Sequence, residues 1–239
     1  MQQIITASNR QQSNSNGINS ASTFAEGEAP TPLVSLEEHR LDPGQGFDFS
    51  DDKEAEIIYY VIDGELSHER KAIESSTTSA GEVQVTSTGT GLSHRVFNDS
   101  DNTVHYLKAV IAPYFDKYTP STNQKSFTAD DLKNTGGEDP QFGAGKPFGV
   151  VTSTYAEYSS LIAHQRGRSF MSYLDAGETT EFEPNYGCQY WLHVVSGEIA
   201  ANGEVLSSGD GMGFAHGDKV AIEAKDAAQL LLIEVPVGE

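Results

Sequence analysis

Short apolar runs, each ended by a turn residue, recur along the whole chain. Residues 59–62 read YYVI and stop at an Asp-Gly pair, and residues 228–236 read AQLLLIEVP and end in proline. β-Branched and aromatic residues favour strands, whereas Gly, Asn and Asp favour the turns between them. In EIAANGEVL the pair Asn202-Gly203 separates two short apolar runs, which predicts a two-residue hairpin. Helical periodicity is nearly absent, so the pattern predicts an all-β sandwich or barrel.

The pattern repeats at an offset of 133 residues, without a gap over about twenty-five positions. The identical pairs are Leu41/Leu174, Asp42/Asp175, Gly44/Gly177, Phe49/Phe182, Val61/Val194, Gly64/Gly197 and Glu65/Glu198. A constant offset that holds at glycines and at apolar positions alike indicates a duplicated structural unit. The chain is therefore predicted to contain two similar β-barrels in tandem.

The segment between the two copies has a different composition. Residues 116–148 are rich in Pro, Gly, Asn and Lys, which predicts a linker between a first barrel at 1–115 and a second at 149–239. One short helix is expected at 128–133, because Thr128 can cap it and two aspartates suit its first turn. The polar stretch that runs to about Asn19 is expected to be either disordered or an extended strand.

Composition narrows the classes of function. The formal net charge of −20 disfavours direct contact with nucleic acid or an anionic membrane surface. No stretch approaches the ~20 apolar residues that span a membrane, and the first twenty residues contain no apolar run of a secretory signal. The single cysteine, Cys188, excludes an intramolecular disulfide and a CxxC metal site. These features favour a cytoplasmic protein, which we expect to be a monomer.

Two phrases resemble a known family. IYYVIDGELSHER, followed by AGEVQVTSTGTGLSH, is similar to the matching phrases of the pirin family, whose members are two-barrel cupins. The spacing from Gly81 to His94 equals the family's spacing from its glycine to its metal-binding histidine. APYFDKYTPSTNQKSF resembles the family's bridge, and LIAHQRGRSFMSYLDAGETTEF and LLLIEVPV resemble its second barrel. The resemblance implies an all-β bicupin, with two tandem cupin (jelly-roll) β-barrels.

The resemblance also implies where a metal would lie. Pirins hold iron in the first barrel through the two histidines of an H-P-H phrase and the histidine and glutamate of an H-S-E phrase. Some members resemble quercetin 2,3-dioxygenases in activity, and the animal pirin is a nuclear transcription cofactor. Here the first phrase falls on Ser50-Asp51-Asp52 and the second on His94-Arg95-Val96, so three of the four ligands differ.

The first barrel carries a reduced set of possible metal ligands. His94, Asp52 and Glu56 supply one imidazole and two carboxylates if their strands point inward, a set that suits Mn²⁺ or Mg²⁺ better than iron. At the shifted positions the second barrel carries Glu183, Asn185 and Gln189 instead. We expect Trp191, Tyr190 and His193 to serve packing, and His216 to lie in a surface turn. The candidates for lining a first-barrel pocket are Tyr60, Phe49 and Ser50.

The sequence is compatible with three functions. The first is a bicupin with a degraded metal site and no required cofactor, which binds a small molecule or a protein without catalysis. The second is a metal-dependent (Fe or Mn) quercetin-type dioxygenase that uses His94 with Asp52 or Glu56. The third is a regulatory partner protein, for which the acidic composition argues against direct DNA contact.

Overall fold

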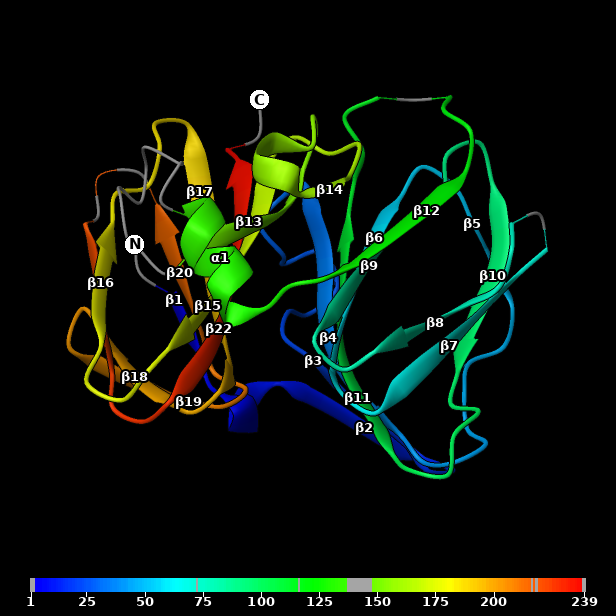
Figure 1. Ribbon diagram of the computed structural model, residues 1–239, viewed down its shortest axis with the longest axis horizontal. Coiled ribbons are helices and arrows are strands. Elements are labelled where there is room, and N and C mark those ends of the chain that lie inside the picture. Colours follow the sequence, from blue (N-terminus) through cyan, green and yellow to red (C-terminus); the bar gives the residue numbers. More distant parts are fainter. Residues whose placement is uncertain are drawn as a thin grey trace. The chain divides into compact units, whose positions relative to one another are not determined.

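Strands make up nearly all the regular structure in the computed structural model, which describes residues 3–71, 73–115, 117–136, 148–215, 217 and 219–237 (Figure 1). Within these ranges the one α-helix is α1 (Ala129–Gly136). Two 3-10 turns, η1 (Ala7–Asn9) and η2 (Glu157–Ser159), accompany it. No helix in the described part of the chain is long and apolar enough to cross a membrane. The all-β fold predicted from the apolar runs is confirmed.

The chain folds into two compact units. One contains residues 11–127 and 161–165, and we call it the first barrel. The other, called the second barrel, contains the N-terminal residues through Arg10 together with 128–160 and 166–239. The limits of 1–115, 116–148 and 149–239 drawn from the sequence stay a prediction.

The first barrel consists of two antiparallel sheets. The large sheet has the order β12-β9-β6-β11-β4-β3-β2, and the small sheet has the order β5-β10-β7-β8. The strands are β2 (Gln11–Ser15), β3 (Ile18–Ser22), β4 (Leu33–Leu41), β5 (Ser50–Asp52), β6 (Glu56–Asp63), β7 (Glu65–Arg70), β8 (Ser76–Ser79), β9 (Glu82–Ser87), β10 (Leu92–Phe97), β11 (Val104–Ile111) and β12 (Ser121–Ser126). The short strand β14 (Leu161–Ile162) contacts β9 and β12.

The second barrel repeats this topology. Its large sheet contains the order β1-β20-β17-β22-β15-β13, and its small sheet has the order β16-β21-β18-β19. The strands are β1 (Gln3–Ile5), β13 (Phe148–Ser153), β15 (Arg168–Leu174), β16 (Thr179–Phe182), β17 (Cys188–Ser196), β18 (Glu198–Ala201), β19 (Glu204–Ser207), β20 (Gly211–Ala215), β21 (Val220–Ala224) and β22 (Ala228–Pro236). Because β6 and β17 occupy equivalent places next to β11 and β22, the duplication inferred from the 133-residue offset is confirmed.

The repeated Gly-Glu pair has a steric cause. Gly64 directly follows β6 and Gly197 directly follows β17, with φ of +78° and +84°. A Cβ atom at Gly197 would lie 2.3 Å from the Ala227 carbonyl oxygen, and one at Gly64 would lie 2.9 Å from the Thr103 carbonyl oxygen. Only glycine tolerates both the positive φ and the close backbone, so each copy keeps it where the chain turns into β7 or β18.

Other local predictions also agree with the structure. β18 and β19 pair from Ala201 to Glu204 around Asn202-Gly203, whose φ values of 49° and 89° suit a type I′ hairpin. Helix α1 begins after Thr128, whose Oγ1 accepts from the Asp131 amide at 3.1 Å, while Asp131 Oδ2 accepts from the Thr128 amide at 3.0 Å. The polar N-terminal stretch is extended, as β1, β2 and β3.

The interiors of the two barrels differ. A hydrophobic cluster inside the second barrel includes Phe148, Phe170, Phe182 and Phe214. A hydrophobic cluster inside the first barrel includes Tyr59 and Tyr106. His39, His68, Arg70, Gln84 and His94 are also buried there. Buried polar side chains must find partners or face a cavity, so the first barrel is where a site is expected.

Candidate functional site

A cavity of about 320 Å³ opens inside the first barrel between its two sheets. From the small sheet it is lined by Ser50, Asp52, His94 and Val96. From β4 and β11 of the large sheet it is lined by Glu37, His39, Tyr106 and Lys108. Cavities of this size hold small ligands, and their polar groups set specificity. We call it the first-barrel pocket.

Strand register explains the small-sheet wall. β5 pairs with β10 so that Ser50 lies opposite His94 and Asp52 lies opposite Leu92. Along β10 the buried residues alternate, so His94 and Val96 face the same side. The four positions carried over from the H-P-H and H-S-E phrases therefore converge on one pocket.

On this wall the polar groups contact one another. His94 Nε2 lies 2.9 Å from Asp52 Oδ2, and Ser50 Oγ donates to the same oxygen at 2.7 Å. Burial lowers the pKa of His94, although the hydrogen bond and the charge of Asp52 act in the opposite direction. The imidazole is therefore neutral at pH 7, and its Nε2–H donates to the carboxylate. Its Nδ1 has no partner in the described part of the chain.

The donor set does not fit a transition metal. First-row metals need three or four N, O or S donors that converge on one point. This wall offers one imidazole and one carboxylate, and these two groups are hydrogen-bonded to each other. The other two ligand positions hold a hydroxyl, Ser50, and an apolar side chain, Val96. Across the described residues, no three His, Cys, Asp or Glu side chains are grouped to hold a metal ion.

Glu56 is not brought to His94. Ile57, Tyr59 and Val61 of β6 belong to the barrel core, so Glu56 lies on the opposite face of the sheet. There it is fully buried, and burial raises its pKa.

Three donors satisfy the Glu56 carboxylate. Ser87 Oγ and Tyr118 Oη donate to it at 2.7 and 2.5 Å, and the His164 amide donates at 3.0 Å. The Tyr118 and His164 rings lie 4.5 Å apart. Glu56 thus ties the segments that carry Tyr118 and His164 to the outside of the first barrel.

The predicted pocket-lining residues fall in three different places. Ser50 lines the pocket. Tyr60 is buried on the same face of β6 as Glu56, and its neighbour Tyr59 lines the pocket instead. Phe49 is 39% exposed, and its ring packs under Lys71 Nζ and the Arg95 guanidinium, at 5.1 and 5.2 Å.

The wall formed by β4 and β11 was not recognised from the sequence. Glu37 Oε2 lies 3.4 Å from both His39 Nε2 and Lys108 Nζ, and His39 Nδ1 contacts Ser20 Oγ at 2.8 Å. The hydrogen bond with His39 is the main reason that the pKa of Glu37 falls to about 2. The sequence did contain a signal for this wall. Glu37 and His39 lie at two-residue spacing from buried Leu41, and Lys108 lies at the same spacing from buried Tyr106, so each group shares one face of its strand.

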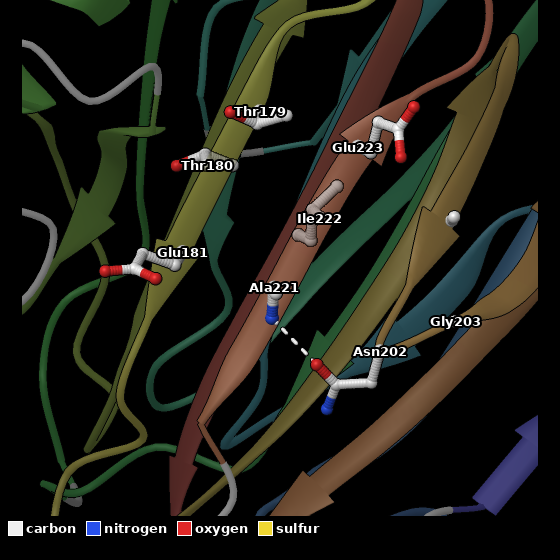
Figure 2. Close-up of a pocket in the computed structure, with 9 residues that line it drawn as sticks. Thr179, Thr180, Glu181, Asn202, Gly203, Ala221, Ile222 and Glu223 are labelled. Atoms are coloured by element: carbon white, nitrogen blue, oxygen red, sulfur yellow. Dashed lines mark hydrogen bonds between the residues drawn. The ribbon is translucent and has the colours of Figure 1, made fainter.

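A larger hollow of about 470 Å³ lies on the small sheet of the second barrel (Figure 2). Asn202 Oδ1 accepts from the Ala221 amide there at 2.8 Å, the bond drawn in Figure 2. Glu181 and Glu223 pair with lysines at 3.0 and 2.8 Å. The lining has no aromatic side chain and its carboxylates are already paired, so this hollow is a poorer candidate than the first-barrel pocket.

The remaining second-barrel residues singled out from the sequence are structural. Trp191 and His193 are 2% and 1% exposed, which agrees with packing roles, and Tyr190 Oη donates to Glu234. Asn185 Nδ2 also donates to Glu234, at 3.1 Å. His216 lies outside the described residues.

Family models match both halves of the chain. Residues 6–111 match the model described as Pirin, and residues 150–235 match the one described as Quercetinase C-terminal cupin domain. Among curated proteins, the quercetin 2,3-dioxygenase of Escherichia coli (strain K12) is 27% identical over 197 residues, covering 82% of this chain and 79% of its own. A putative quercetin 2,3-dioxygenase of Zymomonas mobilis is 29% identical over 198 residues, covering 81% and 78%.

Solved structures show the same architecture. YhhW from Escherichia coli superposes with a TM-score of 0.87 at 26% identity, over 100% of this chain and 99% of that one. The structure described as bacterial pirin YhhW in complex with nickel(II) gives a TM-score of 0.86 at 25% identity, over all of both chains. Both barrels of the described fold are thus matched by one solved protein.

Proposed function

Because this chain belongs to the pirin family of cupins, we propose that its first barrel binds a small organic molecule without a transition metal and without catalysis. The observation that carries the proposal is the contact between His94 and Asp52, 2.9 Å long, at two of the family's four ligand positions. Val96 and Ser50 occupy the other two positions and cannot complete a coordination shell of nitrogen and carboxylate donors.

The pocket itself supports binding. Its volume of about 320 Å³ lies within the range of small-molecule sites, and it combines aromatic walls with a few polar groups. A protein partner is the alternative occupant. The net charge of −20 argues against nucleic acid or an anionic membrane as the partner, and we expect a monomer.

A metal-dependent quercetin-type dioxygenase is the second candidate. One neighbour of the same fold is described as a nickel(II) complex, and curated relatives are named quercetin 2,3-dioxygenases. His94 is the one family ligand that this chain retains. Because Asp52 takes one of its nitrogens and Glu56 lies on the other face of β6, this candidate lacks a converging donor set.

Elemental analysis after purification without added metal, and again after dialysis against Fe²⁺, Mn²⁺ or Ni²⁺, separates the two candidates. We expect well below one equivalent of any of these metals in the natural chain. The matched control is the triple variant Ser50→His, Asp52→His, Val96→Glu, which rebuilds the family's four ligands around His94 and should take up about one equivalent. About one equivalent in the natural chain, lost in His94→Ala, would refute the proposal.

A further inference from the structure

Tyr106 carries a hydroxyl that no described residue satisfies. Tyr106 lines the first-barrel pocket and is 0% exposed to solvent, and its Oη has no hydrogen-bond partner among the described residues. Leaving a buried hydroxyl without a partner is unfavourable, so this position favours a ligand that supplies an acceptor. Burial raises the pKa of Tyr106 well above its usual value, so the hydroxyl keeps its proton and acts as a donor.

The surroundings of Tyr106 suit a flat ring. Its own ring lies 5.1 Å from that of His39, which in turn lies 5.2 Å from Phe47. Tyr59 lines the same cavity, 6.2 Å from Tyr106. Aromatic side chains favour stacked or edge-to-face contact with another ring. At about 320 Å³ the cavity lies near the lower end of the range for ligand sites, so it has room for one or two rings rather than three.

The charges in the pocket select against anions. Lys108 is matched by Glu37 at 3.4 Å, and Arg95 is matched by Glu69 at 2.6 Å. Asp48 and Asp52 also line the pocket, and neither forms an ion pair with lysine or arginine among the described residues. The surplus charge is negative, as it is over the whole chain, so a carboxylate or phosphate ligand would be repelled.

We propose that the first-barrel pocket selects an uncharged aromatic carbonyl compound of one or two rings, whose carbonyl oxygen accepts a hydrogen bond from Tyr106 Oη. This inference rests on the proposed binding function and adds the ligand class and its anchoring residue. Tyr106 contributes to specificity here, because a ligand that lacks an acceptor leaves its hydroxyl unpaired.

NMR titrations of the uniformly ¹⁵N-labelled full chain test the inference with four probes: acetophenone, its anionic analogue benzoate, its apolar analogue ethylbenzene, and quercetin. We expect acetophenone to bind with a Kd at least tenfold lower than that of benzoate or quercetin. Tyr106→Phe should raise the Kd of acetophenone about tenfold and leave that of ethylbenzene unchanged. Glu56→Gln, on the opposite face of the sheet, should change neither Kd.

Loss of fold is controlled separately. Because the Tyr106 hydroxyl makes no bond in the described structure, Tyr106→Phe should unfold at a temperature no lower than that of the natural chain. The inference is overturned if acetophenone does not bind, if benzoate or quercetin binds as tightly, or if Tyr106→Phe leaves the Kd of acetophenone unchanged. Metal content, measured on the same preparation, reports on the proposed function independently of these constants.

Discussion

At the scale of single residues, two carboxylates that the sequence offered as metal ligands have opposite settings. Asp52 lies at the rim of the first-barrel pocket, 42% exposed, and contacts His94. Glu56 lies fully buried on the other face of β6. They lie four positions apart in sequence, yet only Asp52 can act on a ligand of the pocket. Glu56 serves the fold by accepting three hydrogen bonds.

Substitution of Glu56 tests this assignment. Burial raises the pKa of Glu56 above 4.5, so its contribution to stability is fully present below pH 4.5 and is lost as pH rises through the folded-state value. Relative to the natural chain, Glu56→Gln should therefore become more favourable as pH rises from 4.5 to 8. Glu56→Ala should cost about 1–3 kcal/mol, because its buried donors lose their acceptor. Urea unfolding at each pH measures the free energy of unfolding of both variants and of the natural chain. If Glu56→Gln became less stable relative to the natural chain as pH rises, the result would contradict the reasoning.

At the scale of elements, the turns after β6 and β17 connect the large sheet of each barrel to its small sheet. In the second barrel β17 ends at Ser196, and Gly197 passes the backbone of Ala227 before β18 begins. This close approach joins the end of the large sheet to the start of the small one. The same step at Gly64 joins β6 to β7 in the first barrel.

Two glycine substitutions distinguish the cost of a steric clash with the Ala227 backbone from the cost of a positive φ. Gly197 and Gly177 have similar φ values of +84° and +81°, but a Cβ at Gly177 meets nothing within 4 Å. Gly177→Ala should cost about 1 kcal/mol from its positive φ, and Gly197→Ala should cost at least about 1–3 kcal/mol more, because the Ala227 carbonyl must move. Equal losses in chemical denaturation would show that the backbone at Ala227 is not a constraint.

At the scale of the whole molecule, the two barrels share a topology but differ in their interiors. The second barrel is filled by apolar side chains, and its described hollow lies on the small sheet with paired carboxylates. The first barrel keeps an interior cavity with polar walls. The formal charge of −20 is carried by the chain as a whole, and its self-repulsion destabilises the compact state.

Ionic strength should therefore stabilise the protein. Raising NaCl from about 10 to 150 mM shortens the screening length from roughly 30 to 8 Å. We expect the Tm to rise by a few degrees, since about 1 kcal/mol shifts the Tm of a chain of this size by about 2–4 °C. KCl should have the same effect as NaCl, because screening does not depend on the cation. A Tm that falls with salt would show that surface ion pairs outweigh net repulsion.

The sequence by itself determined the features that depend on neighbours along the chain. The Asn202-Gly203 hairpin, the Thr128 cap and the duplicated Gly-Glu turn follow from φ preferences and short-range hydrogen bonds, which a local pattern contains. The family resemblance added that Ser50, Asp52 and His94 belong together, and in the structure all three line the first-barrel pocket, with Ser50 opposite His94 in the β5–β10 pair.

Only the tertiary structure decided which way the side chains of β6 point and what lies across the pocket. The segment EIIYYVI is buried on both faces of its sheet, so its sequence has no alternation of apolar and polar residues. Without that alternation, the sequence does not show whether Tyr59 or Tyr60 faces the pocket, or on which face Glu56 lies. Glu37 and Lys108 are far apart in sequence and meet because β4 pairs with β11. Side-chain direction in a doubly buried strand and contact across a sheet both depend on strand register, which the packing of the whole barrel sets.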